Sequence, residues 1–228
     1  MSSSSSESKI TLYTAGTPNG HPISILLEEL GVSYNPVKLS LADADRGKVE
    51  QHVKADWFLK LNPNGRIPTI THHGAGGKDG DFSVFETSAI LLYLQAEFDK
   101  ENKFGFDPKT NPREYSEVLQ WMFFAHGGVG PMLGQAGHFL RHTEKIPYAI
   151  DRYVNEGKRL LSVLEGHLSK HDYLAGGKYT VADIKTHPWI RLVHYFEIDL
   201  AKEYPKVKAW VDRIDAREAV QKGLKVPA

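Results

Sequence analysis

The 228-residue sequence contains no cysteine. A disulfide framework, a thiolate metal site and a cysteine nucleophile are therefore excluded, because each needs a thiol from the chain. Any thiol chemistry at this protein must use a thiol that a ligand supplies. The eleven histidines, including the adjacent His72 and His73, show no trio with the spacing of metal ligands, so we expect no bound metal.

Long apolar runs and an excess of basic residues are also absent. No stretch approaches the roughly 20 apolar residues that cross a bilayer, and no basic segment is followed by an apolar core near the start. Lys plus Arg and Asp plus Glu both number 28, which removes the positive charge that binding to a phosphate backbone requires. We expect a cytoplasmic protein with no membrane and no nucleic acid among its partners.

The length and the apolar pattern indicate two domains. Residues 1–8 are a serine tract with no apolar anchor, which we expect to be a disordered tail. Residues 9–98 alternate between strand and helix patterns. Residues 99–112 carry charges, glycine and two prolines without an apolar period, which is typical of a linker. Residues 113–228 show helical periods, so we expect an all-helical second domain.

The first domain is expected to start with a strand, a helix and a parallel second strand. A short helix, an antiparallel hairpin around a glycine-rich stretch and an apolar helix follow. The expected strands are 10–14, 33–38, 67–71 and 83–85, and the expected helices are one ending at Gly31, one at 57–61 and one at 88–98.

Four helices are expected in the second domain, at 112–126, 147–167, 181–196 and 205–217. The third is preceded by a capping box, with Thr180 as the N-cap and Asp183 three residues further on. This pattern is a folding signal and not a sign of an active site.

Residues 17–20, Thr-Pro-Asn-Gly, lie between the first strand and the first helix. Backbone N–H groups at the start of a helix lack partners and attract anions. The same residues also suit an ordinary turn in which Asn19 caps the helix. By itself this turn does not distinguish an anion site from a cap.

Residues 62–68, Asn-Pro-Asn-Gly-Arg-Ile-Pro, place Pro68 directly after Ile67 at the start of a strand. A cis bond there would expose the backbone N–H and C=O of Ile67 at the mouth of the sheet, where a peptide-like ligand can pair with them. A trans proline opening an edge strand is the alternative, because only about 5–6% of such bonds are cis.

Residues 85–88, Phe-Glu-Thr-Ser, join the last strand to the next helix. Thr87 or Ser88 can cap that helix while Glu86 faces the cleft. A structural role is open to Glu86 as well, because a carboxylate beside a helix N-terminus stabilises it by roughly 0.3–1 kcal/mol.

Taken together, these three motifs resemble those of the glutathione transferase superfamily, specifically its nu class and the fungal nitrogen-regulator-like class. Residues 130–135 (Gly-Pro-Met-Leu-Gly-Gln) and 146–153 (Ile-Pro-Tyr-Ala-Ile-Asp-Arg-Tyr) resemble the same group. The resemblance runs from about Ile10 to the last helix. It implies an α/β thioredoxin-like N-terminal domain that binds glutathione, followed by an all-α helical bundle.

The resemblance also implies a glutathione site in the first domain. Glu86 would bind the γ-glutamyl ammonium, Thr87 and its helix N-terminus the carboxylate, and Ile67 the cysteinyl backbone. Arg66 and Pro68 belong to the same expected glutathione-binding set.

Asn19 would donate its amide N–H to the glutathione sulfur and also belongs to the glutathione-binding set. Thr17 is a second catalytic candidate, and Tyr13 is either an alternative donor or a packing residue of the first strand. No ionisable base is needed, because a charge-assisted hydrogen bond and a helix terminus together supply the stabilisation that a thiolate requires.

Two departures from the family pattern leave contacts unassigned. Ser88 stands where the family usually has glycine. A His or Gln usually stands five positions before the equivalent of Phe58, where this chain has Val53, so either Gln51 or His52 is the candidate for that glutathione contact.

Trp121, Phe124 and His126 lie on the first helix of the bundle, which borders the cleft in the family's fold. We expect these three side chains, and above all Trp121 and Phe124, either to line a pocket for an electrophile or to pack in the core. The glycine-rich stretch 74–80 does not bridge a strand and a helix, so we expect no nucleotide.

The function implied is an enzyme that uses the sulfur of glutathione as co-substrate, either in transfer to small electrophiles or in the reduction of small disulfides. Reduced or oxidised glutathione would be its ligand. A homodimer is expected, with the small residues of 130–135 allowing helices to approach closely. The alternative is a non-catalytic glutathione-binding or regulatory protein on the same scaffold, since a fold does not fix a function.

Overall fold

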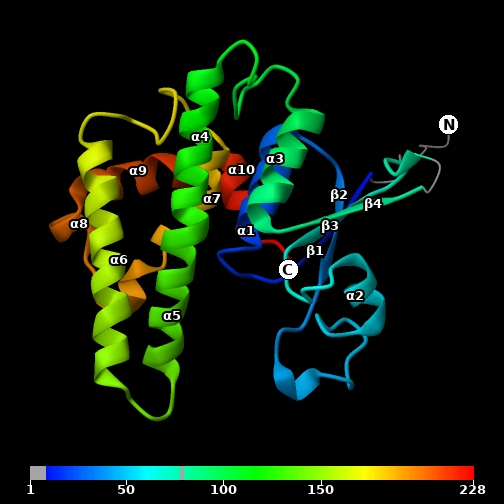
Figure 1. Cartoon of the computed structure of the whole chain (residues 1–228), viewed down its shortest axis with the longest axis horizontal. Coiled ribbons are helices and arrows are strands. Elements are labelled where there is room, and N and C mark those ends of the chain that lie inside the picture. The colour runs from blue at the N-terminus through cyan, green and yellow to red at the C-terminus, as the bar shows by residue number, and fades with distance from the viewer. Residues whose placement is uncertain (1–8, 78–79) are drawn as a thin grey trace.

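A four-stranded mixed sheet forms the centre of the N-terminal half (Figure 1). The computed structural model describes residues 9–77 and 80–228, so the serine tract 1–8 lies outside the described residues. The strands are β1 (Ile10–Thr14), β2 (Tyr34–Lys38), β3 (Thr69–His72) and β4 (Phe82–Phe85). Their order in the sheet is β2-β1-β3-β4.

Strand β1 pairs in parallel with β2 and antiparallel with β3, which pairs antiparallel with β4. The parallel pair needs a crossover, which helix α1 (His21–Leu30) supplies. Side chains alternate across β1, so Ile10 and Leu12 join the main core with α1 and α3 (Thr87–Phe98).

A second, smaller core lies on the other side of the sheet, around the short helix α2 (Asp56–Leu61). Phe58 is fully buried there, and Tyr13 packs its ring 5.7 Å from Trp57 and 5.8 Å from Phe58. Tyr13 is thus a packing residue of β1.

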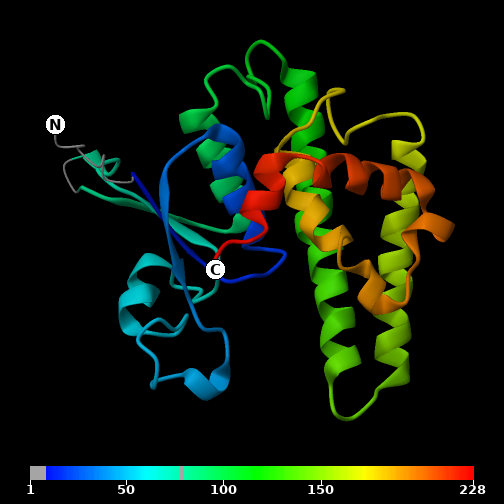
Figure 2. The ribbon, with the colours of Figure 1, turned by 180° about the vertical axis from the view of Figure 1, so that it is seen from behind.

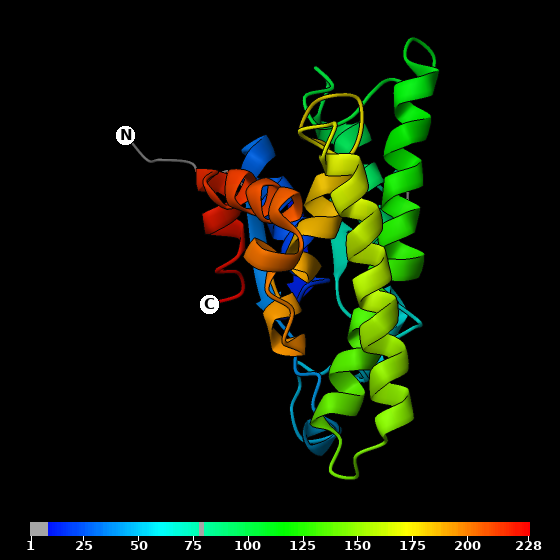
Figure 3. The same ribbon diagram turned by 90° about the vertical axis from the view of Figure 1, so that its left-hand side faces the viewer.

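Helices form the C-terminal half. They are α4 (Pro112–Phe124), α5 (Gly130–Arg141), α6 (Pro147–Leu168), α7 (Val181–Ile190), α8 (Leu200–Glu203), α9 (Pro205–Asp215) and α10 (Glu218–Gly223). A π-helical turn, Ala125–Val129, joins α4 to α5. Figures 1 and 3 show α6 running beside this long pair. The expected α/β domain followed by a helical bundle is confirmed.

The segment 99–112, which connects α3 to α4, is ordered by a carboxylate. Both oxygens of Asp99 accept backbone N–H groups, from Lys103 at 2.8 Å and from Phe104 at 2.7 Å. Phe104 is buried in the main core. The connection therefore packs against the helices that it joins.

The structure adds helix α5, which the sequence prediction missed because Gly and Pro at residues 127–134 are typical of loops. Gly130 and Gly134 face Trp189 of α7, and a Cβ at these positions would meet the indole at 3.1 and 3.4 Å. The small residues therefore make room for a large side chain of the same chain. The expectation that residues 130–135 serve the approach of two subunits stays a prediction.

The helix expected at 181–196 is also corrected, because α7 ends at Ile190 and a separate 3-10 turn follows at Val193–Phe196. Pro188 has no N–H for the carbonyl of Ile184, which weakens the helix shortly before its end. The other predicted segments begin and end within two residues of the observed ones.

Helix α7 begins at the expected capping box, which is confirmed. Thr180 Oγ1 accepts the backbone N–H of Ala182 at 3.3 Å, and Asp183 Oδ2 accepts that of Thr180 at 2.9 Å. Asp183 Oδ1 also accepts Trp210 Nε1 at 2.8 Å and the backbone N–H of Leu174 at 3.0 Å. Burial raises the pKa of Asp183 to about 6, and these donors oppose the rise. The fully buried carboxylate therefore ties α7 to α9.

From this start α7 runs through the middle of the molecule, where it contacts α1 and α3 of the N-terminal half and α4, α5 and α9 of the bundle. Figure 2 shows α10 lying against α1, so the end of the chain also packs on the N-terminal half. Over residues 9–77 and 80–228, no helix has the length and apolar composition to cross a membrane.

We predict that Asp183→Ala lowers the free energy of unfolding by about 3–5 kcal/mol, because several buried donors lose their acceptor at about 1–3 kcal/mol each. Asp199→Ala is the matched control. Asp199 caps α8 by accepting the N–H groups of Ala201 and Lys202, but it is exposed, so its loss should cost about 1 kcal/mol. Urea unfolding measures both, and equal losses would contradict a special role for the Asp183 contacts.

Candidate functional site

A cleft of about 400 Å³ lies between the two halves of the chain. Its lining includes all six residues expected to bind glutathione, which are Asn19, Arg66, Ile67, Pro68, Glu86 and Thr87. On the opposite wall the bundle contributes residues from the π-helical turn, α5 and α7, among them His126, Gln135, Lys185 and Trp189. The three N-terminal motifs, separate in the sequence, thus meet in one place.

Asn19 is held from three sides and is not a helix cap. The N-cap of α1 is Gly20, and no side chain caps that helix. Asn19 Oδ1 accepts Trp189 Nε1 at 3.1 Å and Lys185 Nζ at 3.5 Å, while Thr87 Oγ1 donates to the Asn19 carbonyl at 3.2 Å. With the amide oxygen occupied by two donors, the NH₂ group of the same side chain is left to donate to a ligand.

Thr17 belongs to the turn that carries Asn19. Its Oγ1 accepts the backbone N–H of Gly20 at 3.2 Å, and its carbonyl accepts the N–H groups of Gly20 and His21. Thr17 does not line the cleft. The structure therefore places it behind Asn19, where it shapes the turn.

The loop before β3 presents Ile67 at the edge of the cleft. The Ile67–Pro68 bond is cis. Asn62 organises the loop, because its Nδ2 donates to the Arg66 carbonyl at 2.7 Å and its Oδ1 accepts the Asn64 N–H at 2.9 Å. These hydrogen bonds are made to the backbone of Arg66 and Asn64, so the N–H and C=O of Ile67 are left for a ligand.

Glu86 has an unusual backbone conformation for its residue type. Its φ is 73°, a region that non-glycine residues rarely occupy and that is found at functional sites. It is the N-cap residue of α3, yet its side chain makes no capping hydrogen bond and is 47% exposed. Any structural role of Glu86 at the start of α3 therefore rests on its charge and not on a capping hydrogen bond.

Thr87 and Ser88 lie inside the first turn of α3, so neither is its N-cap, contrary to expectation. The Thr87 hydroxyl is engaged with Asn19, and Ser88 Oγ lies 3.1 Å from His126 Nδ1. The other ring nitrogen of His126 is 3.7 Å from Glu86 Oε2. His126 thus connects the π-helical turn of the bundle to the start of α3.

Lys185 is a cleft residue that the sequence analysis missed. Its side chain is 2% exposed, and burial lowers its pKa to about 8, while the negative charge of Glu86 works against that shift. In the structure every residue from 181 to 188 is buried, although lysine is almost never fully buried unless it is paired. The sequence alone carries no signal of this, because a lysine in a predicted helix is usually exposed. Trp189 follows one turn later on the same helix.

Other predicted residues lie away from the cleft. Trp121 and Phe124 stack edge to face at 5.3 Å against the core, and the Trp121 ring also lies 4.5 Å from that of His167. Neither Trp121 nor Phe124 lines the cleft, so the structure does not bring them to the other site residues.

Neither Gln51 nor His52 reaches the cleft. The buried His52 accepts the Lys54 N–H at Nδ1 and contacts the Ala42 carbonyl through Nε2 at 3.1 Å. Both of its ring nitrogens are therefore committed to the backbone of its own loop. Gln51 is exposed.

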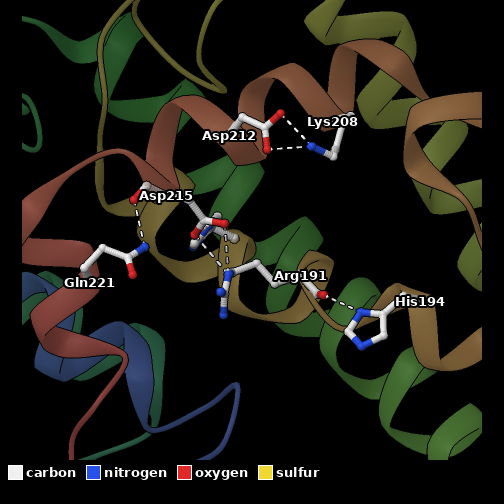
Figure 4. A network of polar contacts seen from close by, with 7 residues as sticks. Arg191, His194, Lys208, Asp212, Asp215 and Gln221 are labelled. Atoms are coloured by element: carbon white, nitrogen blue, oxygen red, sulfur yellow. Dashed lines mark hydrogen bonds and ion pairs between the residues drawn. The ribbon is translucent and has the colours of Figure 1, made fainter.

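A second polar cluster, shown in Figure 4, lies at the C-terminal end of α7. Asp215 of α9 pairs with Arg191 at 2.9 Å and with the buried His187 at 3.0 Å. Burial works to raise the pKa of Asp215, but these two partners outweigh it and the pKa lies below its ordinary value. Lys208 and Asp212 pair beside it on α9. None of these residues lines the cleft, and the cluster joins α7 to α9.

Across the described residues, no group of three or more His, Asp or Glu side chains could hold a metal ion. The groups that the cleft offers to a ligand include the amide of Asn19, the charged side chains of Glu86, Arg66 and Lys185, and the backbone of Ile67.

Both halves of the chain match one protein family. The glutathione S-transferase N-terminal domain matches residues 8–96, and the glutathione S-transferase C-terminal domain matches residues 136–218. The chain belongs to the glutathione S-transferase family.

Individual relatives resemble it over nearly their whole length. The disulfide-bond oxidoreductase YfcG of Escherichia coli (strain K12) is 40% identical over 216 residues, covering 94% of both chains. A glutathione transferase homologue from Lodderomyces elongisporus, whose crystal structure holds two GSH per subunit, has a TM-score of 0.88 at 42% identity and covers 96% of this chain and 99% of its own. The glutathione transferase URE2P6 of Phanerochaete chrysosporium, in complex with oxidized glutathione, has a TM-score of 0.85 at 40% identity with 95% of both chains covered.

We predict that Lys185→Met stabilises the ligand-free protein at neutral pH. The folded pKa of Lys185, about 8, lies below its ordinary value of 10.5, so the folded state binds this proton less tightly than the unfolded state does. The wild-type protein is therefore destabilised below about pH 8 and regains this stability as the pH rises from about 8 to about 10.5. The advantage of the variant should shrink by about 2 kcal/mol between about pH 7 and pH 9.5.

Urea unfolding of both proteins at the two pH values measures this change. Lys208→Met is the control, because it removes the same charge from a half-exposed side chain of α9. A constant difference between wild type and Lys185→Met would show that Lys185 keeps its ordinary pKa in the folded protein.

Proposed function

We propose that this protein binds glutathione in the cleft and uses its sulfur in transfer to small electrophiles or in the reduction of small disulfides. The observation that carries the proposal is the Asn19 side chain, whose oxygen is occupied by two donors while its NH₂ group is free within the cleft. The family and the glutathione-bound structures similar to this chain support the same ligand.

Each part of glutathione has a complementary group. The exposed carboxylate of Glu86 suits the γ-glutamyl ammonium, and the free N–H groups at the start of α3 suit its carboxylate. The Thr87 hydroxyl is engaged with Asn19, so its backbone N–H is the group left for the ligand. The N–H and C=O of Ile67 suit the cysteinyl backbone, and the NH₂ group of Asn19 then donates to the sulfur.

The free energy of one hydrogen bond to the thiolate is large enough to activate the thiol without a general base. A thiol with an ordinary pKa near 8.5 is only about 3% ionised at pH 7, and lowering that pKa by two units requires about 2.7 kcal/mol. A hydrogen bond to a charged group supplies about 1.5–3 kcal/mol. The Asn19 contact is therefore large enough to account for most of the effect.

Disulfide reduction would use only glutathione sulfurs, because the chain has no cysteine. The thiolate attacks one sulfur of a small disulfide, forming a mixed disulfide and releasing the other half as a thiolate that takes a proton. A second glutathione thiolate then releases the remaining half and leaves oxidised glutathione.

We place the chain in the nu class and the fungal nitrogen-regulator-like group, with residues 9–98 and 113–228 as its two domains. The similarity to a disulfide-bond oxidoreductase and to URE2P6 supports this placement. A cytoplasmic location fits a reaction that uses reduced thiols, which persist in reducing compartments. Transfer to electrophiles would serve detoxification, and a purely regulatory binding protein is the alternative.

We predict that wild-type protein with reduced glutathione is active on at least one of a halo-nitrobenzene, a hydroperoxide and hydroxyethyl disulfide. Asn19→Ala should reduce that activity about 10²-fold or more, because it removes the donor to the sulfur. Asn155→Ala, an exposed site on α6, should match wild type. Binding of glutathione without any turnover in this panel would favour the regulatory alternative.

We predict that Glu86→Gln weakens glutathione binding about ten- to hundredfold, because the ligand ammonium loses a charged partner worth about 1.5–3 kcal/mol. The cost to folding should stay below about 1 kcal/mol, since the side chain makes no capping bond. Calorimetry and urea unfolding in one buffer measure both, with Glu114→Gln on α4 as the charge-matched control. A lower urea midpoint with unchanged affinity would make Glu86 a structural residue.

We further propose a homodimer. Phe82 and Phe85 on the edge strand β4 and Phe123 on α4 are 45%, 37% and 61% exposed. Covering such exposed apolar side chains with a second subunit would stabilise the dimer. Permanent interfaces bury more than about 2,000 Å². Light scattering at micromolar concentration should give twice the chain mass of 25.6 kDa. The mass of one chain would rule the dimer out.

A further inference from the structure

Lys185 is a buried cation without an anionic partner in the described part of the chain. Its side chain lines the cleft, yet only 2% of it is exposed. Its hydrogen bond to Asn19 Oδ1 is long, at 3.5 Å, and among the described residues no ion pair joins it to a carboxylate. Burying an unpaired charge is costly. A lysine kept in this position therefore points to negative charge that arrives with a ligand.

The contacts of Lys185 lead to Asn19, the residue proposed to donate to the glutathione sulfur, so the sulfur is the part of the ligand that would bring this charge. Lys185 and Trp189 are four residues apart on α7, so they share one helix face, and both donate to the same oxygen of Asn19. A flipped amide would place its NH₂ group against two donors. The two side chains therefore fix the direction in which the NH₂ group of Asn19 points, and the ammonium also polarises that amide.

We propose that Lys185 is a positioning residue for thiol activation: through Asn19 it aims the amide N–H at the glutathione sulfur, and its charge stabilises the thiolate there. The proposal rests on the proposed binding of glutathione in this cleft. It assigns to the helical half a direct part in an activation step in which the N-terminal half provides the donor to the sulfur, Asn19.

Other charged or titratable groups around Lys185 are less suited to this role. Those that line the cleft with it are Glu86, His126 and Arg66, and the charge of Arg66 is screened by water because its side chain is exposed. Glu86 is negative and would oppose a thiolate, and His126 lies beside Glu86 at 3.7 Å. Asp183 and His187 on α7 itself are turned to α9, where they bond Trp210 and Asp215. His21 on α1 has its pKa lowered by burial, with Arg191 and His187 adding to the effect.

The test compares two ligands and two variants. Wild type, Lys185→Met and the control Lys208→Met are titrated by calorimetry with reduced glutathione and with S-methylglutathione, which has no ionisable thiol. The ultraviolet absorbance of the bound thiolate is followed against pH. We expect Lys185→Met to raise the pKa of the bound thiol by about one unit, because a nearby opposite charge is lost.

Affinity for glutathione should then fall about fivefold at about pH 7.5 and be unchanged at about pH 5.5, where the thiol is protonated in both proteins. Affinity for S-methylglutathione should stay within about twofold at both pH values. This ligand also reports whether the variant is folded. If Lys185→Met binds neither ligand, Lys185→Gln, which keeps a neutral donor, takes its place in the same comparison.

An unchanged thiol pKa in the variant would overturn the role of Lys185 while leaving glutathione binding by the wild type intact. Equal partial losses of affinity for both ligands, in Lys185→Met or in Lys185→Gln where that variant replaces it, would also overturn the role, because Lys185 would then act on another part of the ligand or on the fold. Failure of the wild type to bind either ligand would instead remove the proposed function, and the role of Lys185 with it.

Discussion

The buried carboxylate of Asp183 is the contact on which the geometry of the cleft depends. It receives hydrogen bonds from the backbone of Thr180 and Leu174 and from the indole of Trp210, which fix where α7 begins and how it is rotated. Residues on a helix advance by about 100° each, so a start shifted by one residue would turn Lys185 and Trp189 away from Asn19. A local folding signal outside the cleft thus determines which side chains reach it.

The cleft belongs to neither half alone. The N-terminal half provides Asn19, Glu86 and the exposed backbone of Ile67, but the orientation of the Asn19 amide is decided by donors from α7. The two halves also contribute opposite charges. Glu86 lies exposed at the start of α3, and Lys185 of α7 is buried next to Asn19. An isolated thioredoxin-like half would keep the motif residues and lose the control over the amide.

The features that depend on residues close together in the sequence could be predicted from it. The strands and the α7 capping box follow from local patterns, whereas the meeting of three loops in one site was implied by the family resemblance. The cis form at Ile67–Pro68 was one of two alternatives. Features that depend on packing between distant residues were not accessible. Helix α5 was missed because Gly130 and Gly134 look like loop residues until Trp189 is seen against them, and Lys185 is indistinguishable from a surface lysine until α7 is found buried.

The contact between α10 and α1 has a consequence for how the chain is made. Ser24 Oγ donates to the carbonyl of Gly223 at 2.7 Å, a Cβ on Gly223 would come within 2.6 Å of the Ile25 Cα, and Arg217 forms a two-pronged ion pair with Glu29. During translation, domains fold in order from the N-terminus. Here the first helix completes its packing only after residue 223 has left the ribosome. One face of α1 therefore stays uncovered in the nascent N-terminal domain until α10 has been synthesised.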